Sequence, residues 1–349
     1  MRGIFKHTYQ LLKSYFAEVR LVDLDFVFDI QTTSYKDKRF TRYFWCFGPP
    51  KKAYKQLRPV AVIDRTFLKG RYCETLLTTI AIDPSNHIFP LAFSITDSET
   101  IESWTYFLEM FIVISDKNPK IINIVPKVFP FAIHTFCTFY ILNNIKTTLE
   151  STRITFRMAA ETLTSIDFDK HMNAIRNIDP VGLQYILGIP KEIWYNLYII
   201  MSRYGAAYTN HVESWNNVIL KVRDLPIQVF IEELRRICSE MSYTYREEAE
   251  KSQARLTLWA TDHCESKKFV ADSLTYSVCT SRHYFQMTSY SITDSVNIDD
   301  GTCSFCWWQT MAIPYEHGVF ALGLANVDPT TRVSEYFTND TYKAIYEPI

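Results

Sequence analysis

Residues 58–72 read R-P-V-A-V-I-D-R-T-F-L-K-G-R-Y, and residues 88–108 read I-F-P-L-A-F-S-I-T-D-S-E-T-I-E-S-W-T-Y-F-L. In the first stretch an apolar run, 60–63, leads directly to Asp64, which predicts a buried strand with one carboxylate at its end. Residues 73–82 and 87–95 predict two further strands, because turn signals separate the apolar runs. The stretch therefore predicts three consecutive strands, with an acidic residue on the first.

A helix and a short fourth strand are predicted next. Asp97 and Ser98 are typical helix caps, and the apolar spacing predicts a helix through Met110. Residues 112–115 form a short apolar run that ends at Asp116. The pattern from about 130 to 201 is helical, and a later helix over 211–222 carries Glu213 near its N-terminal end.

Composition changes define three predicted regions. Residues 1–50 predict an α/β segment, with an amphipathic helix followed by alternating strands, and two prolines end it. Residues 51–260 hold the predicted strands and a helical insertion at about 130–205. Residues 261–349 form a C-terminal region with short β-like runs, which includes a close pair of cysteines, Cys303 and Cys306.

The composition excludes several classes of protein. The chain has 349 residues, 47% hydrophobic and 21% charged, which is typical of globular proteins. Nine glycines argue against Gly-rich nucleotide loops, so no nucleotide cofactor is expected. No apolar run approaches the roughly 18 residues of a membrane span, and scattered cysteines without a signal peptide predict an intracellular, reducing setting.

The net charge of −1 gives no support for nucleic-acid binding, which usually comes with a strongly basic domain. A local basic patch would be needed. Around the first strand the chain offers Lys51, Lys52, Lys55, Arg58, Lys69 and Arg71. A solvated charged face explains the same residues equally well.

Residues 51–226 resemble the transposase domain of Mutator-like elements, a branch of the ribonuclease-H-like superfamily. The matching sequence segments are V-I-D-R-T-F-L-K-G-R-Y around Asp64, I-S-D-K around Asp116 and N-H-V-E-S-W-N around Glu213. F-R-M-A-A-E and the tryptophan segment ending in R-Y-G resemble the helical insertion of that family. The resemblance implies an α/β fold: a ribonuclease-H-like mixed sheet with an all-helical insertion.

In such a sheet the first three strands form an antiparallel meander, and the fourth lies parallel to the first. The resemblance therefore implies that Asp64 and Asp116 lie side by side, with Glu213 arriving from a later helix. Three converging carboxylates repel one another unless divalent cations neutralise them, and Mg²⁺ or Mn²⁺ suits oxygen ligands. The implied function is a DNA transposase that cuts the terminal repeats of its element in double-stranded DNA, in the nucleus, as a monomer or a homo-oligomer.

The C-terminal words C-S-F-C-W-W-Q and Y-E-H-G resemble the SWIM zinc finger of the same family, at about 294–325. The resemblance implies zinc ligands at Cys303, Cys306 and His317 in a small zinc-finger-like β region. The position of a further ligand is occupied by Tyr315, so the set is one short of a tetrahedral zinc site. A β-finger held by aromatic packing is the alternative.

Other departures from the family pattern leave two functions open. The connection before Asp116 is short for a crossover to a parallel strand, and Tyr140 stands where the family has a histidine. The family's N-terminal DNA-recognition finger has no counterpart, so the segment 1–50 is expected to be truncated. The chain is thus predicted to be a transposase, active or inactive, or a non-catalytic nuclear DNA-binding regulator of the FAR-RED-IMPAIRED-RESPONSE type.

Overall fold

The computed structural model divides the chain into two compact units. Unit 1 comprises Met1–His134, Thr209–Gln253 and Asn339–Ile349, and unit 2 comprises Thr135–Tyr208 and Ala254–Thr338. The structure describes residues 2–32, 40–53, 56–58, 60–69, 74–108, 114–115, 135–136, 141, 145, 150–162, 165–195, 204, 210–279, 281–289, 292–304 and 306–347.

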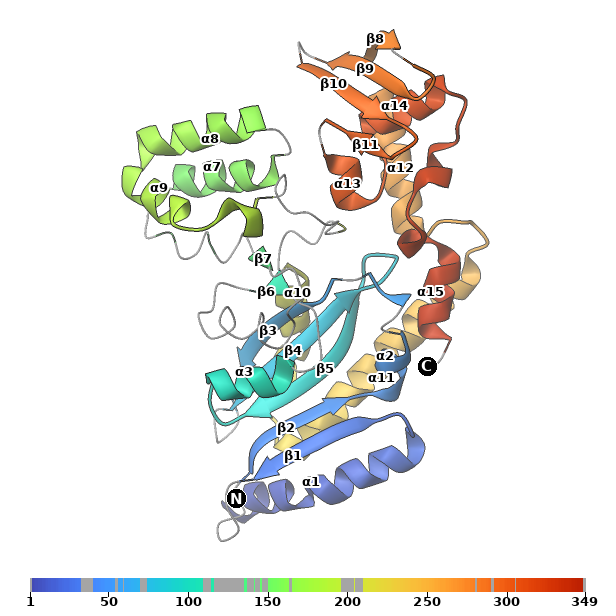
Figure 1. The fold of residues 1–349 in the computed structure, drawn as a ribbon. Coiled ribbons are helices and arrows are strands. Elements are labelled where there is room, and N and C mark those ends of the chain that lie inside the picture. Colours follow the sequence, from blue (N-terminus) through green and yellow to red (C-terminus); the bar gives the residue numbers. More distant parts are fainter. Residues whose placement is uncertain are drawn as a thin grey trace. The chain divides into compact units, whose positions relative to one another are not determined.

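Unit 1 is built on a mixed sheet in which the strand order is β1-β2-β5-β4-β3-β6 (Figure 1). Strands β1 to β5 pair antiparallel with their neighbours, whereas β6 pairs parallel with β3, with Val62 opposite Ile114. The strands are β1 (Val27–Thr32), β2 (Phe40–Cys46), β3 (Val62–Phe67), β4 (Thr75–Ile82), β5 (Ile88–Thr96) and β6 (Ile114–Ser115). The predicted meander and a parallel strand after the crossover are therefore both present in the structure.

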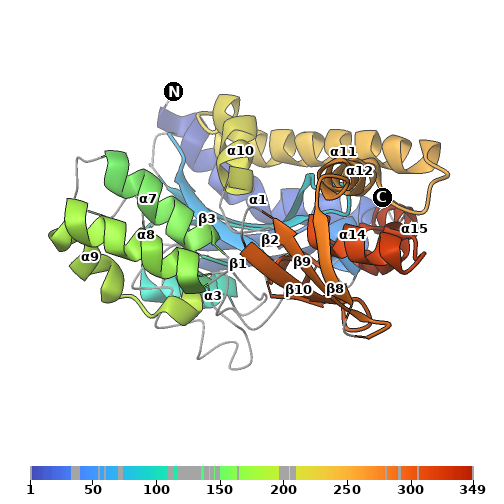
Figure 2. The same cartoon turned by 90° about the horizontal axis from the view of Figure 1, so that it is seen from above.

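The helices of unit 1 cover both faces of this sheet. They are α1 (Arg2–Val22), α2 (Gly48–Ala53), α3 (Ile101–Leu108), α10 (Asn210–Val218), α11 (Ile227–Lys251) and α15 (Asn339–Tyr346). Helices α10 and α11 lie on one face and α3 lies on the other (Figure 2). Every residue of β4 is buried, as expected of a central strand that is covered on both faces.

The start of α3 differs from the prediction. The helix begins at Ile101, and its cap is Thr100, whose hydroxyl accepts a hydrogen bond from the backbone N–H of Ser103 at 3.1 Å. The Ser103 hydroxyl in turn accepts from the N–H of Thr100 at 2.8 Å. This reciprocal pair satisfies two N–H groups that the first turn leaves open. Asp97 is exposed and precedes the cap, so the prediction that it starts the helix is wrong.

Unit 2 contains the predicted helical segment. Its helices there are α7 (Glu150–Glu161), α8 (Ser165–Ile178), α9 (Pro180–Leu187) and a short 3₁₀ turn, η2 (Lys191–Ile193), preceded by the two-residue strand β7 (Thr135–Phe136). Asp179 caps α9, because its carboxylate accepts from the N–H of Gly182 at 2.8 Å. Phe156 and Phe168 pack against the buried Trp194, with ring centroids 5.0 and 5.9 Å away.

The C-terminal part of unit 2 mixes strands and helices. It consists of α12 (Leu258–Ala271), β8 (Thr275–Cys279), β9 (Tyr284–Ser289), β10 (Ile292–Asn297), β11 (Thr302–Cys303), α13 (Trp307–Met311), α14 (Glu316–Leu324), η5 (Pro329–Arg332) and η6 (Glu335–Phe337). Strands β8 to β11 form an antiparallel sheet. The prediction of β-like structure from residue 261 is wrong as far as 271, because Thr257 caps a helix that continues through this stretch.

The region boundaries predicted near residues 50 and 260 stay predictions. Strand β2 lies before the first of them and pairs with β5, which lies after it. Within the described part of the chain, no helix combines the length and the apolar character that a membrane crossing requires.

Candidate functional site

Asp64 lies on β3, two residues after the residue that pairs with β6. In the antiparallel register with β4, Asp64 is opposite Thr78, and the pairing continues beyond it. Asp64 therefore lies inside the strand. The sequence had predicted it at the end of the strand, and that prediction is wrong. Ile63, its neighbour, is in the core cluster that also contains Trp104 and Phe107 of α3. Since side chains alternate along a strand, Asp64 faces the opposite side of the sheet, where α10 lies.

Helix α10 is attached to this face by Trp215. The side chain of Trp215 is fully buried, and its ring centroid is 5.9 Å from that of Phe93 on β5. Phe93 in turn stacks on Trp45 of β2 at 5.3 Å, and Trp45 is 6.2 Å from Phe16 of α1. We call these four residues the aromatic row. The row fixes α10 across the sheet, because buried aromatic rings contribute large apolar areas.

The fixed helix places a hydrogen-bond donor on Asp64. Asn216 Nδ2 donates to Asp64 Oδ2 at 3.1 Å, across 152 positions of sequence. Burial raises the pKa of Asp64 to about 6, while the backbone N–H of Arg65 and the Asn216 amide oppose that rise. The negative charge of Glu213 raises this pKa further. The site therefore holds a half-buried carboxylate whose charge is poorly compensated by the protein alone.

The three predicted catalytic carboxylates are placed as follows. Asp64 is on β3, and Glu213 is exposed in the first turn of α10, near enough for its charge to act on Asp64. Asp116 lies outside the described residues; in the sequence it follows the paired Ile114 by two positions, as Asp64 follows Val62. Asn216 was not singled out in the sequence, although it belongs to the same N-H-V-E-S-W-N motif as Glu213.

Replacing Asp64 with Asn is expected to stabilise the metal-free protein at pH 8. The folded pKa of about 6 exceeds the ordinary value of 3.8, so the folded state binds the proton more tightly and loses stability as pH rises from about 4 to 6. Asn carries no charge and avoids this loss, by about 1–2 kcal/mol after allowance for solvent screening. Urea denaturation in EDTA at pH 8 measures the difference in the free energy of unfolding between the Asp64→Asn protein and the parent.

The gain in stability should shrink as the pH is lowered to 4.5, where Asp64 is itself largely neutral. Asp97→Asn, on the exposed residue after β5, is the matched control and should change the free energy of unfolding by less than about 0.5 kcal/mol. An Asp64→Asn protein no more stable than the parent at pH 8 would contradict the expected cost of this charge.

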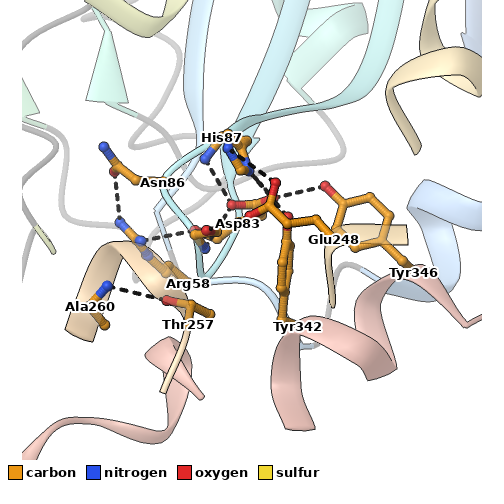
Figure 3. A network of polar contacts seen from close by, with 10 residues as sticks. Arg58, Asp83, Asn86, His87, Glu248, Thr257, Ala260, Tyr342 and Tyr346 are labelled. Atoms are coloured by element: carbon orange, nitrogen blue, oxygen red, sulfur yellow. Dashed lines mark hydrogen bonds and ion pairs between the residues drawn. The ribbon is translucent and has the colours of Figure 1, made fainter. Parts of the chain in front are cut away.

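A second polar cluster lies at the turn between β4 and β5 (Figure 3). The carboxylate of Asp83 is fully buried and accepts hydrogen bonds from the N–H groups of Ser85 and His87 at 2.9 and 2.8 Å. It also accepts from the Tyr346 hydroxyl of α15 at 2.9 Å. Arg58 donates to the Asp83 carbonyl oxygen at 2.8 Å. A buried carboxylate needs such partners, so the cluster joins α15 to the sheet.

His87 extends this cluster to α11. Its ring stacks on Tyr245 with centroids 4.2 Å apart, and its Nδ1 lies 3.2 Å from the Tyr342 hydroxyl. Burial lowers the pKa of His87, but the hydrogen bond and the charge of Asp83, with the charge of Glu248, raise it overall. The sequence predicted only a turn here, because the partners of Asp83 and His87 come from distant parts of the chain.

The predicted basic patch is only partly exposed. Lys55 and Arg71 lie outside the described residues, and Arg58 is 2% exposed and belongs to the Asp83 cluster. Lys52 pairs with Asp25 at 2.7 Å. A buried arginine cannot bind a phosphate backbone at the surface, so Arg58 is removed from the predicted DNA-binding residues.

The three predicted zinc ligands lie in one small subdomain of unit 2 but have other partners. The Cys303 thiol is 3.6 Å from Gln309 Oε1, and the Cys306 thiol is 3.8 Å from the Ser304 carbonyl oxygen. His317 Nε2 is 3.6 Å from Asp294 Oδ2. Among the residues that the structure describes, no three His, Cys, Asp or Glu side chains are grouped so that they could hold a metal ion. These three residues therefore do not fit a zinc site in this arrangement.

Apolar packing and a cation–π contact stabilise this subdomain. Trp308 is buried in a core with Phe285, Met287 and Leu322. Lys267 Nζ lies 4.2 Å from the ring centroid of Tyr315, the residue that stands at a zinc-ligand position of the resembled finger.

Comparison with known proteins supplies one match. The family model described as the MULE transposase domain matches residues 60–144, which include β3, β4, β5 and α3. No curated protein matches the chain.

Proposed function

Since residues 60–144 are a match to the MULE transposase domain, we propose that the protein is a MULE-type transposase that cuts and joins DNA strands with an Asp64–Asp116–Glu213 triad. The proposed substrate is double-stranded DNA with the terminal repeats of a mobile element, and the proposed compartment is the nucleus. A transposase domain implies interaction with DNA in general; the chemistry and the substrate are our proposal.

The observation that carries the proposal is the attachment of α10 to β3 at Asp64. The hydrogen bond from Asn216 to Asp64 joins two of the segments that resemble the family, and these two residues are 152 positions apart in sequence. Glu213, on the same helix, acts on the Asp64 carboxylate through its charge. The electrostatic effect of Glu213 on Asp64 supports the proposal that these two acidic residues belong to one site.

The donor set suits a hard divalent cation. The proposed ligands are carboxylates, which Mg²⁺ and Mn²⁺ prefer. Burial disfavours the charged form of Asp64 and raises its pKa to about 6, and a bound cation would stabilise that charge. Asp64 and Glu213 would hold such an ion, with Asp116 proposed as the third ligand. When bound, the ion supplies a Lewis acid that polarises a phosphoryl oxygen and lowers the pKa of an attacking water or 3′-hydroxyl.

The residues of the chain have separate tasks in this proposal. Asp64, on a central strand with buried neighbours, provides a fixed carboxylate. Glu213 is exposed, so it can be approached by solvent and by a DNA strand. The aromatic row keeps α10 in place, so that the distance between the two carboxylates does not depend on a loop.

The full-length protein is expected to nick duplex DNA that carries the element's terminal repeats in the presence of Mn²⁺, and to be inactive in EDTA. End-labelled duplexes resolved on a denaturing gel measure the nicks, and a duplex with shuffled end sequences is the control for specificity. DNA binding without cleavage in any divalent metal would exclude the enzymatic proposal and favour the non-catalytic regulator.

A further inference from the structure

The amide of Asn216 is the side chain that holds the Asp64 carboxylate in the described structure. Its Nδ2 lies 3.1 Å from Asp64 Oδ2. We propose that Asn216 is a positioning residue, which holds Oδ2 of Asp64 and so orients this carboxylate for a divalent cation. This inference rests on the proposed function.

The helix geometry pairs Asn216 with Glu213. Residues three apart on an α-helix are neighbours on one face, so Glu213 lies beside Asn216, whose amide contacts Asp64 of β3. Trp215, between them in sequence, is fully buried against Phe93. A rigid helix therefore sets the positions of the amide donor and of Glu213 together.

The chemistry of an amide suits this task. Asn216 Nδ2 carries two donor hydrogens and no charge, so it can hold a carboxylate oxygen without neutralising the site, as Lys or Arg would. A carboxylate that is held by a neighbouring hydrogen bond loses less freedom when it binds a metal ion. Outer partners of metal ligands act in this way in many proteins, and their removal lowers metal affinity by about 10- to 100-fold.

The next residue provides a matched control. Asn217 is exposed on α10 and has the same side chain as Asn216. Asn217→Ala therefore makes the same chemical change on the same helix, one position further along, without touching Asp64.

The test is a titration of the full chain with Mn²⁺ alone, followed by electron paramagnetic resonance of the free ion. Asn216→Ala is expected to weaken the Mn²⁺ site by about 10- to 100-fold, whereas Asn217→Ala should leave it within about twofold. Asn216→Gln keeps an amide donor and should recover part of the affinity. Asp64→Asn identifies the site, because the Mn²⁺ signal assigned to it should be lost.

Activity provides a second measurement. In the cleavage assay, Asn216→Ala should raise the Mn²⁺ concentration for half-maximal rate by the same factor, with most of the maximal rate recovered at saturating Mn²⁺. A merely structural role would lower the folded fraction in urea denaturation and leave the Mn²⁺ affinity of the folded protein unchanged.

The outcomes separate this inference from the proposed function. A parent protein that binds Mn²⁺ through Asp64 without cutting DNA would refute the transposase activity, and the affinity ratio would still decide the role of Asn216. A folded Asn216→Ala protein with the Mn²⁺ affinity of the parent would overturn the inference, even if the parent cuts DNA. A parent without any Mn²⁺ site that Asp64→Asn removes would overturn it as well.

Discussion

Replacing Asp64 with Asn is expected to lower the rate of Mn²⁺-dependent DNA cleavage by about a thousandfold or more. Stabilisation of developing charge by a metal ion is worth several kcal/mol, and each 1.36 kcal/mol corresponds to a factor of ten in rate. An amide has the shape of the carboxylate but only one weak metal-binding oxygen and no charge. Rates on terminal-repeat DNA, measured at saturating Mn²⁺ with equal folded fractions, test this expectation.

Glu213→Gln should cause a loss of similar size, because it removes the charge that α10 contributes. Asp224→Asn is the matched control: Asp224 is an exposed acidic residue shortly after α10 and should have no effect on the rate beyond about twofold. If both Asp64→Asn and Glu213→Gln cut DNA as fast as the parent, the assigned carboxylates do not carry the chemistry.

Truncating Trp215 to Ala is expected to destabilise the protein by about 3–5 kcal/mol. The side chain is fully buried and packs on Phe93, and removing a buried tryptophan costs both the transfer free energy and the free energy of the cavity. Such a loss is a large part of the 5–15 kcal/mol that stabilises a typical protein. Urea denaturation followed by circular dichroism measures it.

Trp215→Ala should also disturb the site around Asp64, because α10 carries both Glu213 and Asn216. Val218→Ala is the matched control on the same helix: Val218 is 42% exposed, so its truncation should cost less than about 0.5 kcal/mol. A Trp215→Ala protein within 1 kcal/mol of the parent would show that the aromatic row does not anchor this helix.

The meander could be predicted from the sequence because its signals are local. The buried strands β4 and β5 are mostly apolar stretches, with a few threonines and one serine, between clear turn residues. Strand β3 carries the acidic residue that distinguishes the stretch. Even so, Asp64 was predicted at the end of its strand, since the apolar run ends at Ile63 and the polar residues Arg65 and Thr66 follow Asp64. They lie in β3 because pairing with Leu77 and Leu76 of β4 continues past Asp64.

The partners of Asp64 and Asp83 could not be predicted in the same way. Asn216 and Tyr346 reach their carboxylates across 152 and 263 positions, and neither contact has a local sequence pattern. No local pattern singles out α15, because its sequence mixes tyrosines, Ala344 and Ile345 with polar residues. Its buried face, which includes Tyr342, Ile345 and Tyr346, is explained only by the sheet on which it packs.

The C-terminal cysteines show a different limit of a sequence motif. The words around Cys303 and His317 resemble a zinc finger, yet their side chains contact Gln309 and Asp294. A motif fixes residue types along the chain, whereas metal binding requires those residues to converge in space.

The docking of α15 has a consequence for synthesis of the protein on the ribosome. Asp83 is made 263 residues before Tyr346, an interval of about 10–50 s at translation rates of 5–20 residues per second. During that interval the nascent β4–β5 hairpin exists without the hydroxyl that later joins its buried carboxylate. The hydrogen bond that joins α15 to the sheet can therefore form only after residue 346 has been synthesised, so it belongs to the late steps in the folding of unit 1.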